Sequence, residues 1–296
     1  MNKSFTLIEI LVVIVVIGIL SSFILFGMSS ITDKANIAKS QAFLNSMDNS
    51  LLLSRVSEWK LDDSSGNDSW NGRTATLVNT PTLTLNCPQG SCYTFNGSNQ
   101  YAWIADNDDY FNFGSQMSAF VWIKGGAQAG YKSYFSQYEY TLNKRSWWMG
   151  NSGSPYNKIQ IMFSDNGTEN SGHIKTYISS NAYLDNNWHL IGFTWSNGVF
   201  LMYVDGQSVS YTSTGTLTSS TFYNSDTNIT IGCYMNNGSY WQYFNGQIDD
   251  VRLYNQPIPT SEIQQNYYSG LNNLIVKGEL NNKEYGQRLQ ELVINN

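Results

Sequence analysis

Between residues 60 and 255 the chain alternates short apolar runs with clusters of Asn, Gly, Ser and Asp. The apolar runs have the length of strands, as in Ser118–Lys124, and no segment of this region has the pattern of a long helix. Asn197-Gly198 and Asp205-Gly206 offer the left-handed backbone that hairpin turns require. The pattern therefore predicts a three-stranded meander over residues 188–211 within two packed antiparallel sheets.

Composition supports a mainly β protein and argues against one class of partner. The chain has 20 Tyr, 9 Trp and 24 Gly, whereas only 13% of its residues are charged. Aromatic residues favour strands, and glycine favours turns. A net charge of −6 lacks the basic footprint that nucleic-acid binding requires. We therefore expect no nucleic-acid partner.

The N-terminal region has a different pattern. An uncharged stretch from Ile10 to Thr32 follows Glu9. As a helix it would rise about 35 Å, enough to cross a bilayer core of about 30 Å. We expect a single membrane span at residues 7–28 with a cytoplasmic N-terminus, and continuation of the helix to residue 56. A secretory signal peptide or a plain anchor is the alternative, although neither gains anything from an acid at this position.

The segment from Lys3 to Glu9, with the apolar run behind it, resembles the class III signal of type IV pilins and pseudopilins. The resemblance implies that a prepilin peptidase removes residues 1–4 by cleavage between Ser4 and Phe5 and that the new N-terminus is methylated. Residues 5–56 would then pack against other pilin-like subunits. Ser4 replaces the usual Gly of the family. Phe26 occupies the region of the family's helix-kinking proline, which favours a minor pilin or a pseudopilin.

Glu9 has a physical role in this interpretation. A carboxylate at bilayer depth is costly and is usually functional. Cleavage would leave a positive amine on Phe5, one helical turn from Glu9. In an assembly, Glu9 of one subunit can neutralise the amine of its neighbour, so that two buried charges are paired. We therefore expect Glu9 to be required for assembly.

A second resemblance, to the laminin-G-like and concanavalin-A-like lectin superfamily, covers most of the remaining chain. Six segments carry it in the right order: 59–63, 68–72, 92–97, 188–189, 202–206 and 246–255. The last of these, from Gly246 to Asn255, has the closing pattern of the superfamily intact. The resemblance implies an antiparallel β-sandwich jelly roll over residues 57–268, and a short helical tail is expected at residues 269–296.

Many members of this superfamily hold one calcium ion near the first turn and the last strand. The matching positions here are Asp68, Asn71 and Asp249. Calcium takes six to eight oxygen ligands, and Asp249 and Asp250 are expected on opposite sides of a strand, so only one of them can join the site. The alternative is that these acids are solvated turn residues and a partner of Arg252.

The cysteines suggest one disulfide. Cys87 and Cys92 bracket a Pro- and Gly-containing turn, which allows a tight hairpin to bring them together. Outside the cytoplasm such a pair is expected to oxidise. Cys233 lies in an apolar run and is expected to be a small buried residue.

Four aromatic residues lie in or beside polar, Gly-rich segments: Trp147, Trp148, Tyr240 and Trp241. Such side chains can stack on sugars or anchor a protein partner, or they can pack against the protein itself. The chain has no G-x-S-x-G nucleophile motif. It also lacks the E-x-D-x-x-E segment that carries the paired carboxylates of related glucanases. We therefore expect a non-catalytic domain, with His189 in a structural role.

Together these features predict a pilin-like subunit of the cell envelope, either a minor pilin or a pseudopilin. It would be a single-span membrane protein, or extracellular in a pilus or pseudopilus after processing. Its lectin-like domain would bind a glycan or a surface protein. A stand-alone membrane-anchored lectin and an envelope glycan hydrolase are the alternatives.

The charge-pairing hypothesis predicts that Glu9→Gln impairs assembly in the native host, because the amine of Phe5 loses its partner. The measurement is the yield of assembled protein on the cell surface. Mass spectrometry provides the control, since both proteins should begin with N-methylated Phe5. Normal assembly of the variant would contradict the hypothesis, and an intact Met1 in the wild type would favour the stand-alone lectin.

Overall fold

The computed structural model describes Leu7 and residues 11–17, 54–106 and 109–294. Leu7 and residues 11–17 are helical and exposed, as expected for the start of the N-terminal helix. Ser4, Phe5 and Glu9 lie outside the described residues. Within the described ranges, no helix combines the length and the apolarity that a bilayer crossing needs. The chain divides into two units, and the second runs from Ser54 to Asn296.

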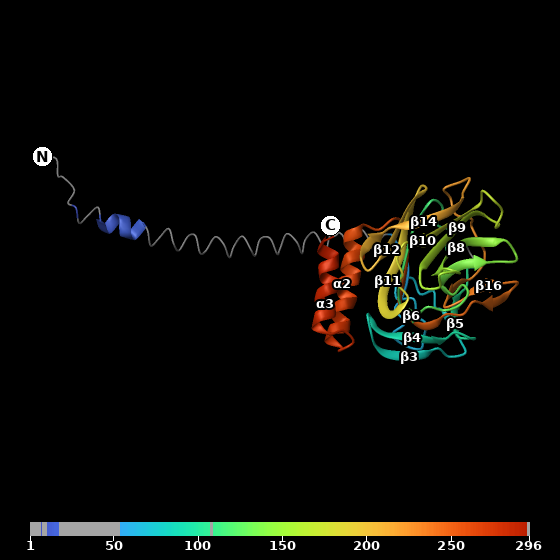
Figure 1. The fold of residues 1–296 in the computed structure, drawn as a ribbon, viewed down its shortest axis with the longest axis horizontal. Helices are drawn as coiled ribbons and strands as arrows, with labels where there is room; N and C mark the ends of the chain where they lie inside the picture. The colour runs from blue at the N-terminus through green and yellow to red at the C-terminus, as the bar shows by residue number, and fades with distance from the viewer. Residues whose placement is uncertain (1–6, 8–10, 18–53, 107–108, 295–296) are drawn as a thin grey trace. The chain divides into compact units, whose positions relative to one another are not determined.

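The second unit contains two sheets, as the sequence predicts (Figure 1). The first sheet has eight strands. They are β1 (Arg55–Trp59), β3 (Thr82–Cys87), β4 (Gly90–Asn96), β6 (Gln116–Gly126), β11 (Asp185–Ser196), β12 (Val199–Val204), β13 (Gln207–Val209) and β18 (Asn245–Tyr254). Their order is β13-β12-β11-β6-β18-β4-β3, and β1 pairs with β18.

The second sheet has ten strands. They are β2 (Thr76–Val78), β5 (Tyr101–Ile104), β7 (Ser133–Glu139), β8 (Lys144–Asn151), β9 (Ile159–Gly167), β10 (Ile174–Ser179), β14 (Tyr211–Thr216), β15 (Ile229–Ile231), β16 (Tyr234–Asn236) and β17 (Ser239–Trp241). Their order is β14-β10-β9-β8-β7-β15-β5-β2, with β16 beside β7 and β17 beside β16.

Aromatic side chains fill the space between the sheets. Trp147 on β8 is fully buried, and its ring centroid lies 4.9 Å from that of Phe135 on β7 and 6.4 Å from that of Phe193 on β11. Phe193 belongs to the other sheet, so these rings join the two layers. Burial of each large apolar side chain contributes on the order of 2 kcal/mol, which makes this layer the main source of stability.

The predicted meander is formed by β11, β12 and β13. Asn197 and Gly198 have φ angles of 50° and 92°, as two-residue hairpin turns require. The third strand is shorter than expected, because Tyr211 begins β14 and pairs with Ser179 in the other sheet.

Two C-terminal helices cover the outer face of the first sheet (Figure 1). They are α2 (Thr260–Val276) and α3 (Asn282–Ile294). Tyr267 of α2 stacks on Trp122 of β6, with ring centroids 5.5 Å apart. The helical segment thus starts at Thr260, before the predicted residue 269, because Pro259 ends the extended chain and can precede a helix. Asn281 caps the start of α3, because its Oδ1 accepts a hydrogen bond from the N–H of Glu284 at 2.9 Å.

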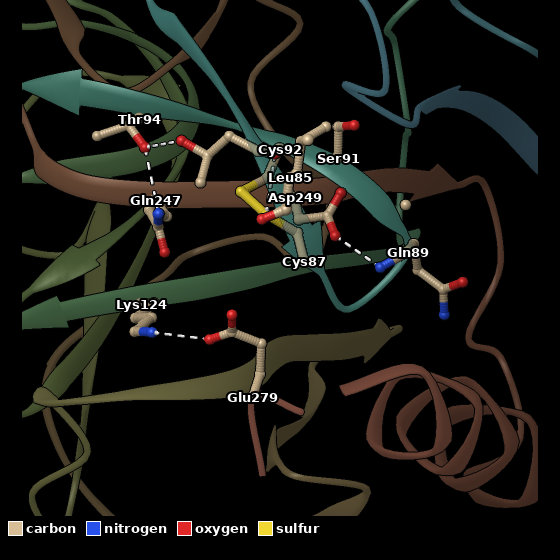
Figure 2. Close-up of a disulfide and its surroundings, with 12 residues drawn as sticks. Leu85, Cys87, Gln89, Ser91, Cys92, Thr94, Lys124, Gln247, Asp249 and Glu279 are labelled. Atoms are coloured by element: carbon tan, nitrogen blue, oxygen red, sulfur yellow. Dashed lines mark hydrogen bonds and ion pairs between the residues drawn. A yellow bond between two sulfur atoms is a disulfide. The ribbon is translucent and has the colours of Figure 1, made fainter. Parts of the chain in front are cut away.

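The Cys87–Cys92 disulfide is confirmed, and it closes the β3–β4 hairpin with Cα atoms 5.8 Å apart (Figure 2). The hairpin also anchors α2. Nζ of Lys277 donates to the carbonyls of Cys87 and Gly90 at 2.8 and 2.9 Å. Nδ2 of Asn273 donates to the carbonyl of Pro88 at 2.8 Å. Cys233 is buried with a free thiol, as predicted.

Replacing both disulfide cysteines by serine should lower the free energy of unfolding by about 2 kcal/mol, because the short loop regains its freedom in the unfolded chain. Urea unfolding measures this loss. Wild-type protein unfolded in the presence of a reductant is the matched control and should show the same loss. Equal stability of the oxidised wild type and the double variant would contradict the prediction.

Candidate functional site

A groove of about 450 Å³ lies on the outer face of the second sheet. Its lining comes from β14, β10, β9, β8, β7 and β16 and from three adjoining loops. The lining residues are Tyr131, Tyr138, Tyr140, Trp148, Gln160, Met162, Glu169, Ile174, Thr176, Ile178, Thr214 and Tyr234. Two clefts of about 520 and 600 Å³ open beside α3, but their linings are mainly polar. The groove is the candidate site because it combines aromatic faces with a few polar groups.

The floor of the groove follows from strand pleating. Successive side chains of a strand point to opposite faces, so Trp147 enters the core and Trp148 faces outward. The ring of Trp148 lies over Gly150, where a Cβ atom would fall 2.2 Å from Cζ2 of the indole. Tyr131 meets the edge of Trp148 with centroids 6.1 Å apart, and it is 48% exposed. Trp148 and Tyr131 therefore form a rigid apolar corner with one accessible ring.

The other end of the groove is polar. The buried Arg145 donates from Nε to the hydroxyl of Tyr138 at 3.2 Å. Its Nη2 lies 3.3 Å from Oε2 of Glu169, and its guanidinium lies over the ring of Tyr140 at 4.7 Å. Burial raises the pKa of Tyr138, so its phenol stays neutral. This end offers fixed donors and acceptors suited to hydroxyl groups.

The four aromatic residues named from the sequence have different positions. Trp147 is fully buried between the sheets, so the prediction that it contacts a ligand is wrong. The reason is that Trp147 lies within strand β8 and faces the core. Trp148 lines the groove. Tyr240 stacks on Tyr101 with centroids 4.2 Å apart, and Trp241 is 52% exposed on β17.

Sequence reasoning missed the groove tyrosines Tyr131, Tyr138, Tyr140 and Tyr234. Tyr138 and Tyr234 lie on β7 and β16, far apart in the chain, yet their ring centroids are 5.2 Å apart. The register of β7 against β8 shifts at Ser133/Phe135 and at Gln137/Tyr138, so simple alternation does not show which of its side chains share a face. The sequence of β7 also does not show which strand lies beside it.

Asp68 and Asn71, two of the residues proposed for calcium, are used by their own turn. Oδ1 of Asp68 accepts hydrogen bonds from the N–H groups of Glu58 and Trp70 at 3.0 and 2.9 Å. Nδ2 of Asn71 donates to the hydroxyl of Tyr110 at 2.5 Å. These contacts hold the turn against β1.

Asp249, the third residue, lies at the disulfide hairpin, where its Oδ2 accepts from the N–H of Gln89 at 2.7 Å (Figure 2). The expectation that Asp249 and Asp250 face opposite sides is wrong, because a β-bulge interrupts the alternation and Asp250 has a φ of 47°. Asp250 instead pairs with Arg252, with Oδ2 and Nη2 2.9 Å apart. Asp250 is therefore the partner of Arg252 that the alternative interpretation expected. Neither acid is a solvated turn residue, because both are buried.

The carboxyl group of Asp249 is buried near that of Asp250. Burial, reinforced by the charge of Asp250, raises the pKa of Asp249 well above the usual range. In the described part of the chain, no group of three or more His, Cys, Asp or Glu residues is arranged to hold a metal. Calcium binding at Asp68, Asn71 and Asp249 stays a prediction.

His189 has the structural role expected of it. Its Nδ1 lies 2.7 Å from Oδ2 of Asp205, and its Nε2 lies 3.1 Å from Oδ1 of Asp185. Burial lowers the pKa of His189, but the two carboxylates outweigh burial and raise the pKa to about 9. The imidazolium is therefore a buried cation. It links Asp185 at the start of β11 to Asp205 directly after β12.

Comparison with known families and structures agrees with both resemblances. The concanavalin A-like lectin/glucanases superfamily matches residues 96–264, and the prokaryotic N-terminal methylation motif matches residues 1–25. No curated protein matches the chain. These matches confirm a methylation motif fused to a concanavalin-A-like domain.

Three solved structures illustrate the shared fold. Domain 4 of AbnA, a GH43 extracellular arabinanase from Geobacillus stearothermophilus solved with arabinotriose, has a TM-score of 0.54 and 16% identity, over 72% of this chain and 98% of that one. The binding domain of Paraclostridial Mosquitocidal Protein 1 has a TM-score of 0.57 and 14% identity, over 75% and 53%. The receptor binding domain of botulinum neurotoxin C/D mosaic serotype has a TM-score of 0.55 and 13% identity, over 74% of this chain and 52% of that one. The chain spans about half of each toxin domain.

The His189 cluster predicts a pH-dependent stability. The folded pKa of about 9 exceeds the unfolded value, so the stabilisation is complete below about pH 6.5 and is lost as the pH rises through 9. The free energy of unfolding should fall by roughly 1–3 kcal/mol between pH 7 and pH 9.5. His189→Gln should show a smaller fall, because it has no proton to lose. An equal fall in both proteins, measured by urea unfolding, would contradict the assignment.

Proposed function

Because the chain belongs to the concanavalin A-like lectin/glucanases superfamily, we propose that the groove of its second sheet binds a carbohydrate and that a pilin-like N-terminus presents this domain at the cell surface. The observation that carries the proposal is the lining of the groove, in which five aromatic rings lie beside Glu169, Gln160 and two threonines.

The lining has the chemistry that sugar recognition requires. A sugar ring has apolar C–H faces and a rim of hydroxyl groups. Tyr131 is 48% exposed and offers a flat apolar surface on which a sugar ring can stack, and the buried Trp148 supports it from beneath. Glu169 and Tyr138 can bond to hydroxyl groups at the other end. Domain 4 of AbnA, solved with arabinotriose, provides a precedent for an oligosaccharide ligand on this fold.

The same lining supports binding without catalysis. Hydrolysis of a glycosidic bond requires two carboxyl groups on either side of the bond. Among the described residues that line the groove, Glu169 is the single carboxylate, and Arg145 is bound to it. We therefore propose a binding domain, in preference to an envelope glycan hydrolase.

The N-terminal motif supports the placement of this domain. A prokaryotic methylation motif at residues 1–25 implies processing by a prepilin peptidase and contact with other pilin-like subunits. A membrane span at residues 7–28 would leave the β domain outside the cytoplasm. The protein would then be a minor pilin or pseudopilin that attaches cells to a glycan or a glycosylated surface protein.

Two substitutions test the groove without disturbing the core. Tyr131→Ala removes a half-exposed ring, and Glu169→Gln removes a half-exposed carboxylate. Each should weaken glycan binding about tenfold or more, a loss of about 1.4 kcal/mol. Tyr131→Ala should leave the melting temperature unchanged, whereas Glu169→Gln should lower it, because the buried Arg145 loses its charged partner. The measurement is a glycan array followed by titration, with the full chain in detergent micelles.

Tyr268→Ala is the matched control, because Tyr268 is 47% exposed on α2, which covers the other sheet. It should bind like the wild type. Unchanged binding by both groove variants, or equal weakening in the control, would contradict the assignment of the groove. Glycan turnover by the purified chain would revive the hydrolase alternative.

A further inference from the structure

The β16–β17 hairpin continues the groove face of the second sheet. Tyr234 lines the groove from β16, and its partner in the antiparallel register is Trp241 on β17. Side chains paired across two strands lie on the same face. Trp241 is 52% exposed, so its ring is open to a ligand. The aromatic surface therefore extends beyond the groove lining to Trp241.

Three interactions hold this hairpin in place. Glu139 of β7 is buried, and its Oε1 and Oε2 accept hydrogen bonds from the N–H groups of Asn237 and Gly238 at 2.6 and 3.3 Å. These two residues form the turn of the hairpin. On the opposite face, Tyr240 stacks on Tyr101 with centroids 4.2 Å apart. Trp241 is thus presented by a braced hairpin and loses little freedom when it contacts a ligand.

The distance between Trp148 and Trp241 exceeds the length of one sugar ring. Trp148 is on β8, and β7 and β16 separate it from β17. Three strand spacings of about 4.8 Å place the two tryptophans about 14 Å apart. Tyr138 and Tyr234 fill the interval with ring centroids 5.2 Å apart. Trp148 is 2% exposed, and the accessible ring beside it is that of Tyr131. A ligand that reaches from Tyr131 to Trp241 must therefore be a chain of several sugars that crosses the strands.

The charged residues along the groove favour an uncharged ligand. Glu169 already has a partner in Arg145, whose guanidinium is buried beneath the tyrosines. An acidic sugar would place its carboxylate beside Glu169, and like charges at an interface oppose binding. A neutral chain can accept hydrogen bonds from Tyr138 and donate to Glu169 without adding charge.

Resting on the proposed glycan-binding function, we propose that the ligand is a linear, uncharged oligosaccharide that runs from Tyr131, beside Trp148, past Tyr234 to Trp241. Trp241 is the specificity-determining residue of this site. It adds affinity only for chains long enough to reach the β16–β17 hairpin.

The test is a titration of the full chain in detergent micelles with linear neutral oligosaccharides of arabinose, xylose, glucose, mannose and galactose, from disaccharides to octasaccharides. Uronic-acid chains of the same lengths serve as acidic probes. For the wild type, affinity should rise about tenfold or more from the disaccharide to the hexasaccharide of the preferred sugar. Trp241→Ala should abolish this rise and leave disaccharide binding within about twofold. Tyr268→Ala should keep the wild-type length dependence.

The outcomes separate this inference from the function on which it rests. Binding that is independent of chain length, or a length dependence that survives Trp241→Ala, overturns the inference and leaves a glycan-binding groove. Preference for uronic-acid chains also overturns it. If no oligosaccharide binds the wild type, the proposed function fails, and the inference fails with it.

Discussion

The burial of one aromatic layer between the two sheets determines which side chains can meet a ligand. Trp147 packs against Phe135 of its own sheet and Phe193 of the other. Because strand side chains alternate, each inward position turns its neighbours outward. Trp148 reaches the groove for this reason alone, and Gln160 and Met162 flank the inward Ile161 in the same way. A shift of one residue in β8 would exchange core and groove, so the apolar core maintains the binding face.

The features that the sequence predicts well have local causes. Asn197-Gly198 and Asp205-Gly206 carry their turn conformations within two residues. Cys87 and Cys92 are close because the turn between them is short. The superfamily motifs likewise gave the sandwich and its approximate limits.

The features that the sequence does not predict depend on strand register or on distant partners. The choice between Trp147 and Trp148 required the direction of the pleat in β8. The bulge at Asp249 and Asp250 has no local signal, because it arises from the pairing of β18 with β6. The contact between Tyr138 and Tyr234 exists only once β16 lies beside β7.

Buried acids fasten the backbone at three places in the structure. Asp68 accepts N–H groups of its turn, Glu139 accepts those of the β16–β17 turn, and Asp249 accepts that of Gln89. A buried carboxyl group is costly unless it is hydrogen-bonded, and backbone donors supply these bonds. The hydrogen bonds that Glu139 accepts brace the β16–β17 hairpin and so help to position Trp241 beside the groove.

The two halves of the proposed protein complement each other energetically. Sugar stacking on one or two rings contributes little affinity, since an aromatic contact adds about 0.5–1.5 kcal/mol beyond its area. A pilin-like assembly would repeat the domain at fixed spacing, and linked binding sites can raise apparent affinity by about 10²–10⁴ without new contacts. A linear glycan also repeats along its length. Weak single sites on a repeated support would therefore attach a cell firmly to a polymer while each contact stays reversible.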